Sequence, residues 1–175
     1  MKNDLKKYVM TALFAALTCA ATMAIRIPTP GTGGYIHPGD ALVILSGVIL
    51  GPAFGFLAGG IGSALSDLIG GYFLYVPITF VIKGLVALLC GLIYQKASRN
   101  PKLRYPAVAA GGVTDILLVA GGYCLCESFI YGLGGALASV PANLIQGASG
   151  LIISMVLYPI LIAIPDVKQM TVVHQ

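Results

Sequence analysis

Apolar runs separated by short polar or glycine- and proline-rich breaks occupy almost the whole chain. Most of these runs approach or exceed the roughly 20 residues with which a helix crosses a bilayer, although the second is short for a full crossing. The pattern predicts helices over six ranges: 8–27, 39–51, 53–71, 76–94, 106–131 and 139–164. We therefore predict an all-α integral membrane protein, a compact bundle of six transmembrane helices forming a single domain over residues 1–175.

One break in this pattern is longer and richer in helix breakers than the others. Residues 28–38 contain Pro28, Pro30 and Pro38 together with three glycines. Such a segment does not form a helix, and irregular backbone is tolerated at membrane depth only where it lines a cavity or is buried in protein. The segment is therefore predicted to lie outside the hydrocarbon layer or to line a cavity.

Composition and charge fix the expected topology. The chain is 58% hydrophobic and only 9% charged, whereas roughly 25% of residues are charged in a soluble domain. Every Lys and Arg except Arg26 and Lys83 lies before residue 8, in the break 95–105 or at residue 168. Six helices place these segments on one side, and the positive-inside rule assigns that side and both termini to the cytoplasm of a cell with this protein in its inner or plasma membrane.

The same topology makes the segments 28–38, 71–75 and 132–138 external. The net charge of +4 then reflects orientation in lipid, so no nucleic-acid partner is expected. The four cysteines lie in apolar segments without CxxC spacing, which favours buried packing over redox or metal chemistry.

Ionisable residues inside the predicted helices are functional candidates, because a charge in the membrane is costly. Counting ~1.5 Å per residue from the external helix ends brings polar side chains of four helices to a common depth beneath the 28–38 segment. Charges of both signs, amides and phenols at one level suit a small polar heteroaromatic ligand. The predicted substrate site consists of Tyr35, His37, Asp40, Asp67, Tyr75, Thr79, Lys83, Tyr123, Glu127, Asn143 and Gln146.

Structural roles remain open for several of these residues. Lys83 and Glu127 would neutralise each other as an ion pair, and Asp67 would cap the end of its helix. Asn143 and Gln146 would form hydrogen bonds between helices.

Asp115 lies deeper in its predicted helix, towards the cytoplasm, and is expected to have a packing role.

The motifs of common enzyme classes are not found in this sequence. No predicted helix contains a His, and the chain has neither an HExxH nor a GxSxG motif. We therefore expect no enzymatic activity, no metal site and no cofactor.

Small residues form two rows at helical spacing. Ala12, Ala16 and Ala20 recur every four positions along the first helix, and such a row permits close approach of another helix. A second row is formed by Gly55, Gly59, Ser63 and Ser66. One row is expected to serve packing within the chain and the other to face a partner.

Several short motifs occur in a characteristic order: Gly39-Asp40-Ala41, Leu50-Gly51-Pro52, Gly62 to Tyr72, Pro77-Ile-Thr79 with Lys83-Gly84, and Pro141-Ala-Asn143-Leu-Ile-Gln146. On these motifs the chain resembles the S components of energy-coupling factor (ECF) transporters, in their riboflavin-type or general vitamin branch. The resemblance covers nearly the whole chain.

The resemblance implies a specific mode of action. S components bind a vitamin from outside beneath the first loop, and the row on the first helix contacts a coupling T subunit. Toppling in the membrane, driven through that subunit by two cytoplasmic ATPases, releases the vitamin inside.

The substrate class stays open at this stage. A pyridoxine-like or hydroxymethylpyrimidine-like ligand is favoured, because Glu127 and Lys83 suit ring nitrogen and hydroxyl groups, while riboflavin and pantothenate remain alternatives. A stand-alone proton-coupled carrier or channel, with Asp67, Asp115 and Glu127 as a relay, is the alternative function.

Overall fold

The computed structural model describes residues 2–173, so residue 1 and residues 174–175 of the predicted domain lie outside the described part. Helices dominate these residues, and a short two-stranded ribbon interrupts them. The elements are α1 (Lys2–Ala24), β1 (Ile27–Pro28), β2 (Tyr35–Ile36), α2 (Asp40–Leu50), α3 (Pro52–Gly70), α4 (Tyr75–Ala97), a 3₁₀ turn (Pro101–Leu103), α5 (Arg104–Ile162) and α6 (Pro165–Val173).

Long apolar helices confirm an all-α, multi-pass membrane protein. Within residues 2–173, four helical segments are long and apolar enough to cross a membrane: 5–24, 52–70, 75–97 and 101–162. Helix α2 has 11 residues and is therefore only about 16 Å long. All of its residues except Leu42 are buried, as expected for a helix that is apolar on every side.

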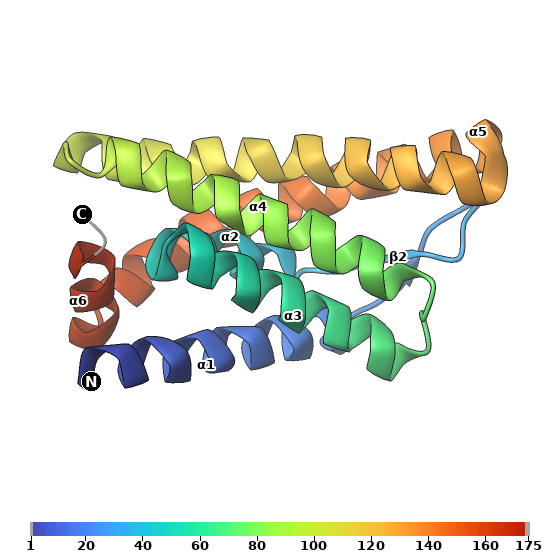
Figure 1. The fold of residues 1–175 in the computed structure, drawn as a ribbon. Coiled ribbons are helices and arrows are strands. Elements are labelled where there is room, and N and C mark those ends of the chain that lie inside the picture. The colour runs from blue at the N-terminus through green and yellow to red at the C-terminus, as the bar shows by residue number, and fades with distance from the viewer. Residues whose placement is uncertain (1, 174–175) are drawn as a thin grey trace.

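Helix α5 is broken once, at Gly132, whose φ of 77° and ψ of 165° are not helical. The chain reverses there, and two arms run back along each other (Figure 1). Each arm exceeds the roughly 20 residues that a bilayer requires. The predicted loop 132–138 is wrong, because residues 133–138 are helical. Glycine adopts positive φ without a steric penalty, so one residue makes the reversal.

The segments at the two ends of the bundle differ in charge. The start of α1, the basic break between α4 and α5, and α6 lie at one end, whereas the β1–β2 segment and the chain reversal within α5 lie at the other (Figure 1). An ion pair of 2.6 Å between Lys6 Nζ and Asp166 Oδ1 joins α1 to α6. Helix α6 was not predicted; it begins with Pro165 and buries Val167 and Met170.

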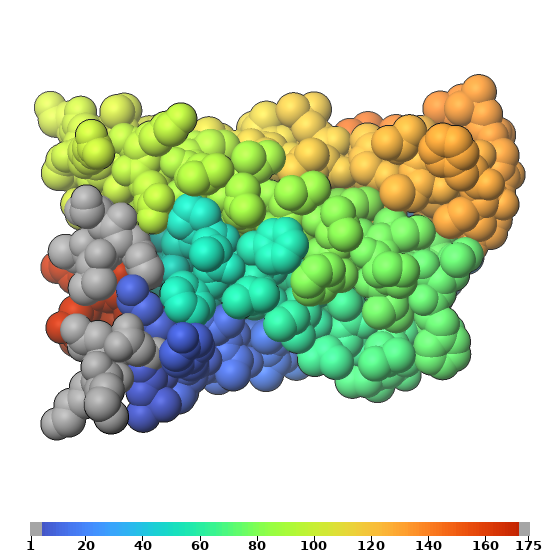
Figure 2. All heavy atoms as spheres, viewed as in Figure 1, coloured from blue at the N-terminus to red at the C-terminus, as the bar shows by residue number. Residues whose placement is uncertain are grey.

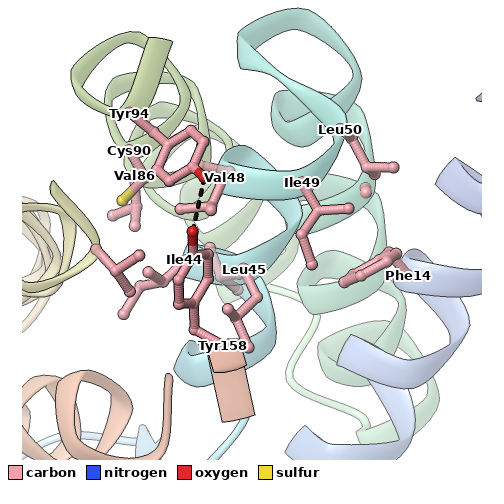
Figure 3. Packing of buried hydrophobic residues seen from close by; sticks show 14 of the residues in the cluster. Phe14, Ile44, Leu45, Val48, Ile49, Leu50, Val86, Cys90, Tyr94 and Tyr158 are labelled. Carbon is pink, nitrogen blue, oxygen red and sulfur yellow. Dashed lines mark hydrogen bonds between the residues drawn. The ribbon is translucent and has the colours of Figure 1, made fainter. Parts of the chain in front are cut away.

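The hydrophobic core surrounds α2. Figure 3 shows its side chains packed against α1, α4 and the returning arm of α5. Across this core the hydroxyl groups of Tyr94 and Tyr158 form a hydrogen bond of 2.7 Å. The labelled core residues are Phe14, Ile44, Leu45, Val48, Ile49, Leu50, Val86, Cys90, Tyr94 and Tyr158. This packing fixes α2 and with it Asp40, its first residue.

The two rows of small residues have different surroundings. The row on α3 faces inward, and a Cβ added at Gly55 would lie 2.5 Å from the Cα of Gly47 in α2. The α3 row therefore serves packing within the chain. Ala12, Ala16 and Ala20 of the α1 row are exposed. Both α1 and α3 reach the molecular surface in Figure 2.

Candidate functional site

A small polar cavity lies beneath the β1–β2 segment, enclosed by α3, α4 and both arms of α5. Its volume, counted as space open to the centre of a water molecule, is about 20 Å³, which holds about one water molecule. It is lined by Thr29, Gly34, Tyr35, His37, Asp67, Tyr75, Thr79, Tyr123, Glu127, Asn143 and Gln146. Every predicted site residue except Asp40 and Lys83 is therefore part of the lining of this one cavity.

The cover of the cavity is an ordered ribbon. Ile27 pairs with Ile36 and Pro28 with Tyr35 in antiparallel register. Thr29 and Gly34 were not predicted as lining residues, because composition alone does not show how a glycine-rich segment folds back. The space beneath the ribbon is smaller than a ring-sized molecule.

Polar contacts attach the ribbon to the end of α3. The hydroxyl of Tyr35 donates a hydrogen bond of 2.6 Å to Asp67 Oδ1. The Arg26 guanidinium lies 4.8 Å from the centre of the Tyr35 ring and 5.6 Å from that of Tyr72, and its Nη2 donates to the Ser66 carbonyl at 2.9 Å. Arg26, which lies outside the predicted site, thus helps to hold the cover closed.

Glu127 forms the acidic part of the opposite wall. Its Oε1 accepts a hydrogen bond of 2.9 Å from the Tyr75 hydroxyl, and its Oε2 accepts one of 2.5 Å from the Ser139 hydroxyl. Nearby, the hydroxyl groups of Thr79 and Tyr123 form a hydrogen bond of 2.9 Å. Carboxylates, hydroxyls and amides therefore converge on one cavity, the arrangement that orients a small polar ligand.

Lys83 and Asp40 lie behind this wall rather than in it. Both side chains are fully buried, and Lys83 Nζ lies 2.5 Å from Asp40 Oδ1. The alternative pairing of Lys83 with Glu127 is therefore wrong. Gln146 links the pair to the cavity, because its Nε2 donates to Asp40 Oδ2 at 2.8 Å while its Oε1 accepts from the His37 backbone N–H at 3.1 Å.

Acid should weaken the fold through His37, which lies in the cover outside the helices. Burial lowers the pKa of His37 from 6.5 to about 4. Below about pH 6.5 the unfolded chain therefore binds a proton that the folded chain does not, and the free energy of unfolding falls as the pH drops to about 4. With about 1.4 kcal/mol per pKa unit, the loss is on the order of 3 kcal/mol.

Thermal unfolding of wild type and His37→Asn between these pH values tests this prediction. The Asn amide oxygen can accept the hydrogen bond that His37 Nδ1 now accepts from the Gly39 N–H. We expect a shallower acid dependence in the variant. Parallel curves for the two proteins would show that His37 is not the responsible group.

Comparison with known proteins identifies the class. A sequence model of the family "ECF-type riboflavin transporter, S component" matches residues 2–163. The chain belongs to this family, so it is a component of a membrane transporter for vitamin uptake. The family is one of transporter components and not of enzymes. The resemblance drawn from the sequence motifs is thereby confirmed.

Three individual relatives are similar to about half of this chain or more. An uncharacterized protein of Pyrococcus woesei is 38% identical over 132 residues, 75% of this chain and 85% of the relative. The thiamine precursor transporter HmpT of Lactococcus lactis subsp. cremoris is 28% identical over 160 residues, 91% of this chain and 89% of HmpT. A UPF0397 protein of Streptococcus agalactiae is 36% identical over 97 residues, about half of each chain. The similarity to HmpT thus includes the segments that line the cavity.

Proposed function

We propose that this chain is the substrate-binding S component of an ECF-type importer and captures a small water-soluble vitamin or vitamin precursor on the external side. The polar cavity beneath the β1–β2 segment carries the proposal, since carboxylates, hydroxyls and amides from α3, α4 and α5 line it together. The eleven lining residues come from segments that are far apart in the sequence and that the fold brings together, as in many ligand-binding sites.

The proposed topology has six crossings with both termini in the cytoplasm. The basic segments lie at the end of the bundle opposite the β1–β2 segment that covers the cavity (Figure 1), and the positive-inside rule assigns that end to the cytoplasm. The cavity then opens to the outside. Helix α2 is too short to cross the bilayer alone, so the second crossing is only partly helical.

The proposed ligand has a single ring, as in pyridoxine or hydroxymethylpyrimidine, rather than the three fused rings of riboflavin or the open chain of pantothenate. HmpT is by its name a thiamine precursor transporter. Asp67 and Glu127 offer hydrogen-bond acceptors to ring N–H and hydroxyl groups. The rings of Tyr75 and Tyr123, 6.3 Å apart between centres, offer flanking aromatic surface. A fused-ring ligand demands a larger outward movement of the ribbon.

The proposed partners are a coupling T subunit and, through it, two cytoplasmic ATPases. The exposed row on α1 borders an apolar groove of about 390 Å³ between α1 and α3, and Ala12, Ala16, Phe54 and Leu57 are among its lining residues. Small side chains let a partner helix approach α1 closely. The chain itself has no P-loop motif, so energy would come from the ATPases.

Widening the α1 row should block assembly without affecting the ligand site. Ala16 is exposed and far along α1 from the cavity cover, so Ala16→Leu should keep ligand affinity within about twofold while at least tenfold less T subunit is co-purified, because the added side chain separates the helices. Ala110→Leu, at an exposed position on α5, is the matched control. Normal co-purification of Ala16→Leu would contradict the assigned interface.

A transport assay on the isolated chain distinguishes an S component from a stand-alone proton-coupled carrier. In liposomes that hold the purified chain alone, an S component binds its vitamin at the surface but does not concentrate it. Addition of the T subunit, the ATPases and ATP should start accumulation. Accumulation driven by a pH gradient, without the ATPases, would instead establish the proton-coupled carrier.

A further inference from the structure

Asp115 is the one carboxyl side chain among the described residues with both oxygens buried and without a hydrogen-bond partner. It belongs to the first arm of α5 and is fully buried. Both of its carboxylate oxygens are buried without a hydrogen-bond donor. A carboxylate that is ionised, buried and unpaired is strongly unfavourable, whereas a neutral carboxylic acid in the same place is far less so.

Asp115 also lies beside the buried ion pair. A Cβ added at Gly150 would lie 2.7 Å from Asp40 Cβ and 3.3 Å from Asp115 Oδ2. The two acidic side chains therefore approach each other across this glycine of the returning α5 arm. Gly150 is thus the point at which α2 and both arms of α5 meet.

The charges around Asp115 do not balance if it is ionised. The titratable groups that interact electrostatically with it are Asp40 from α2 and Lys83 and Cys90 from α4. Lys83 supplies one positive charge, and Asp40 already holds its ammonium at 2.5 Å. If Asp115 is ionised, this buried group holds two carboxylates, Asp40 and Asp115, and only one ammonium, Lys83. The excess negative charge is neutralised by one further positive charge.

We propose that Asp115 binds a proton and that this proton keeps the buried Asp40–Lys83 pair assembled beneath the cavity. A proton fits better than a metal cation, because the ammonium of Lys83 repels other cations and because the described residues form no cluster of three or more metal-ligating side chains. Asp115 is thus a positioning residue in the interior of the bundle and not a group that contacts the ligand.

The bound proton influences the cavity through a continuous set of contacts. Without it, the charged Asp115 competes with Asp40 for Lys83. Asp40 also accepts a hydrogen bond from Gln146, which holds the His37 backbone in the cover. Loss of the proton therefore loosens the wall and the cover together.

Infrared spectroscopy of the full chain in detergent, without any vitamin, tests the proposal. Wild type at neutral pH should show a C=O stretching band of a protonated carboxyl group that is absent from Asp115→Asn. Thermal unfolding supplies the second readout. The midpoint of wild type should fall as the pH rises above about 6.5, because the folded chain keeps a proton that the unfolded chain, in which Asp titrates at about 4, has already released. Asp115→Asn should follow the flatter curve of a chain without this group.

Three control variants test whether the infrared band belongs to Asp115. Asp166→Asn, at an exposed position on α6, should retain both the band and the pH dependence. If Asp115→Asn does not fold, the band must persist in Asp67→Asn and Glu127→Gln, which remove the two carboxyl groups of the cavity. A wild-type spectrum without the band, or its loss in either of these two variants, overturns the proposal. Since no vitamin is present, that result leaves the proposed transport function intact.

Discussion

Lys83→Met is expected to destabilise the folded protein by about 3–5 kcal/mol, the cost of removing one partner from a buried ion pair. Lys83 and Asp40 are both fully buried and lie 2.5 Å apart. Loss of the ammonium leaves the Asp40 carboxylate at the start of α2 with only the Gln146 amide as a partner. The free energy of unfolding, measured by denaturant titration in detergent micelles, reports this loss.

The double variant Asp40→Asn/Lys83→Met provides the matched control. It removes both charges, and an uncharged pair of similar volume often restores the stability of a protein that has lost a buried ion pair. We expect the double variant to regain most of the loss. A single variant as stable as wild type, or a double variant no more stable than the single one, would show that the pair does not support the fold.

Glu127→Gln is expected to weaken vitamin binding by roughly 10- to 100-fold while the chain stays folded. A hydrogen bond to a charged group contributes about 1.5–3 kcal/mol, and each 1.4 kcal/mol corresponds to a factor of about ten in affinity. The amide oxygen of Gln can still accept from the Tyr75 hydroxyl, and Ser139 can donate to the Ala136 carbonyl, which it already contacts at 2.9 Å. Calorimetric titration with the ligand and a thermal unfolding curve separate affinity from stability.

Ser128→Ala, one position further along α5, is the control for Glu127→Gln. Ser128 does not line the cavity, and its hydroxyl donates to the Leu125 carbonyl at 2.7 Å. Its affinity should match that of wild type. Equal affinity of Glu127→Gln and wild type would remove Glu127 from the ligand site.

The helices and most of the cavity could be predicted because hydropathy and helical rise determine them. Depth counting places Asp67, Thr79, Glu127 and Gln146 at one level without knowledge of how the helices are arranged. It does not give the rotation of each helix about its axis. For that reason a pairing of Lys83 with Glu127, which lies at similar depth on another helix, stayed open as an alternative, whereas Lys83 pairs with Asp40.

Other features depend on tertiary contacts that have no local signal. Asp40 follows Gly39 directly after the proline-rich segment and was predicted as a residue of the substrate site, whereas the burial of α2 carries it behind the cavity wall. The break in α5 needs only Gly132, although the surrounding glycines suggested a longer loop. Thr29 and Gly34 reach the cavity only because the ribbon folds back.

The most direct test is titration of the purified chain in detergent with pyridoxine, hydroxymethylpyrimidine, riboflavin, thiamine, pantothenate and biotin, read as the shift in thermal unfolding and then by calorimetry. We predict saturable binding of one single-ring ligand, pyridoxine or hydroxymethylpyrimidine, without T subunit or ATPases. Binding of riboflavin in their place would contradict the proposed ligand class. A folded sample that binds none of the six would contradict the assignment of the cavity as a vitamin site.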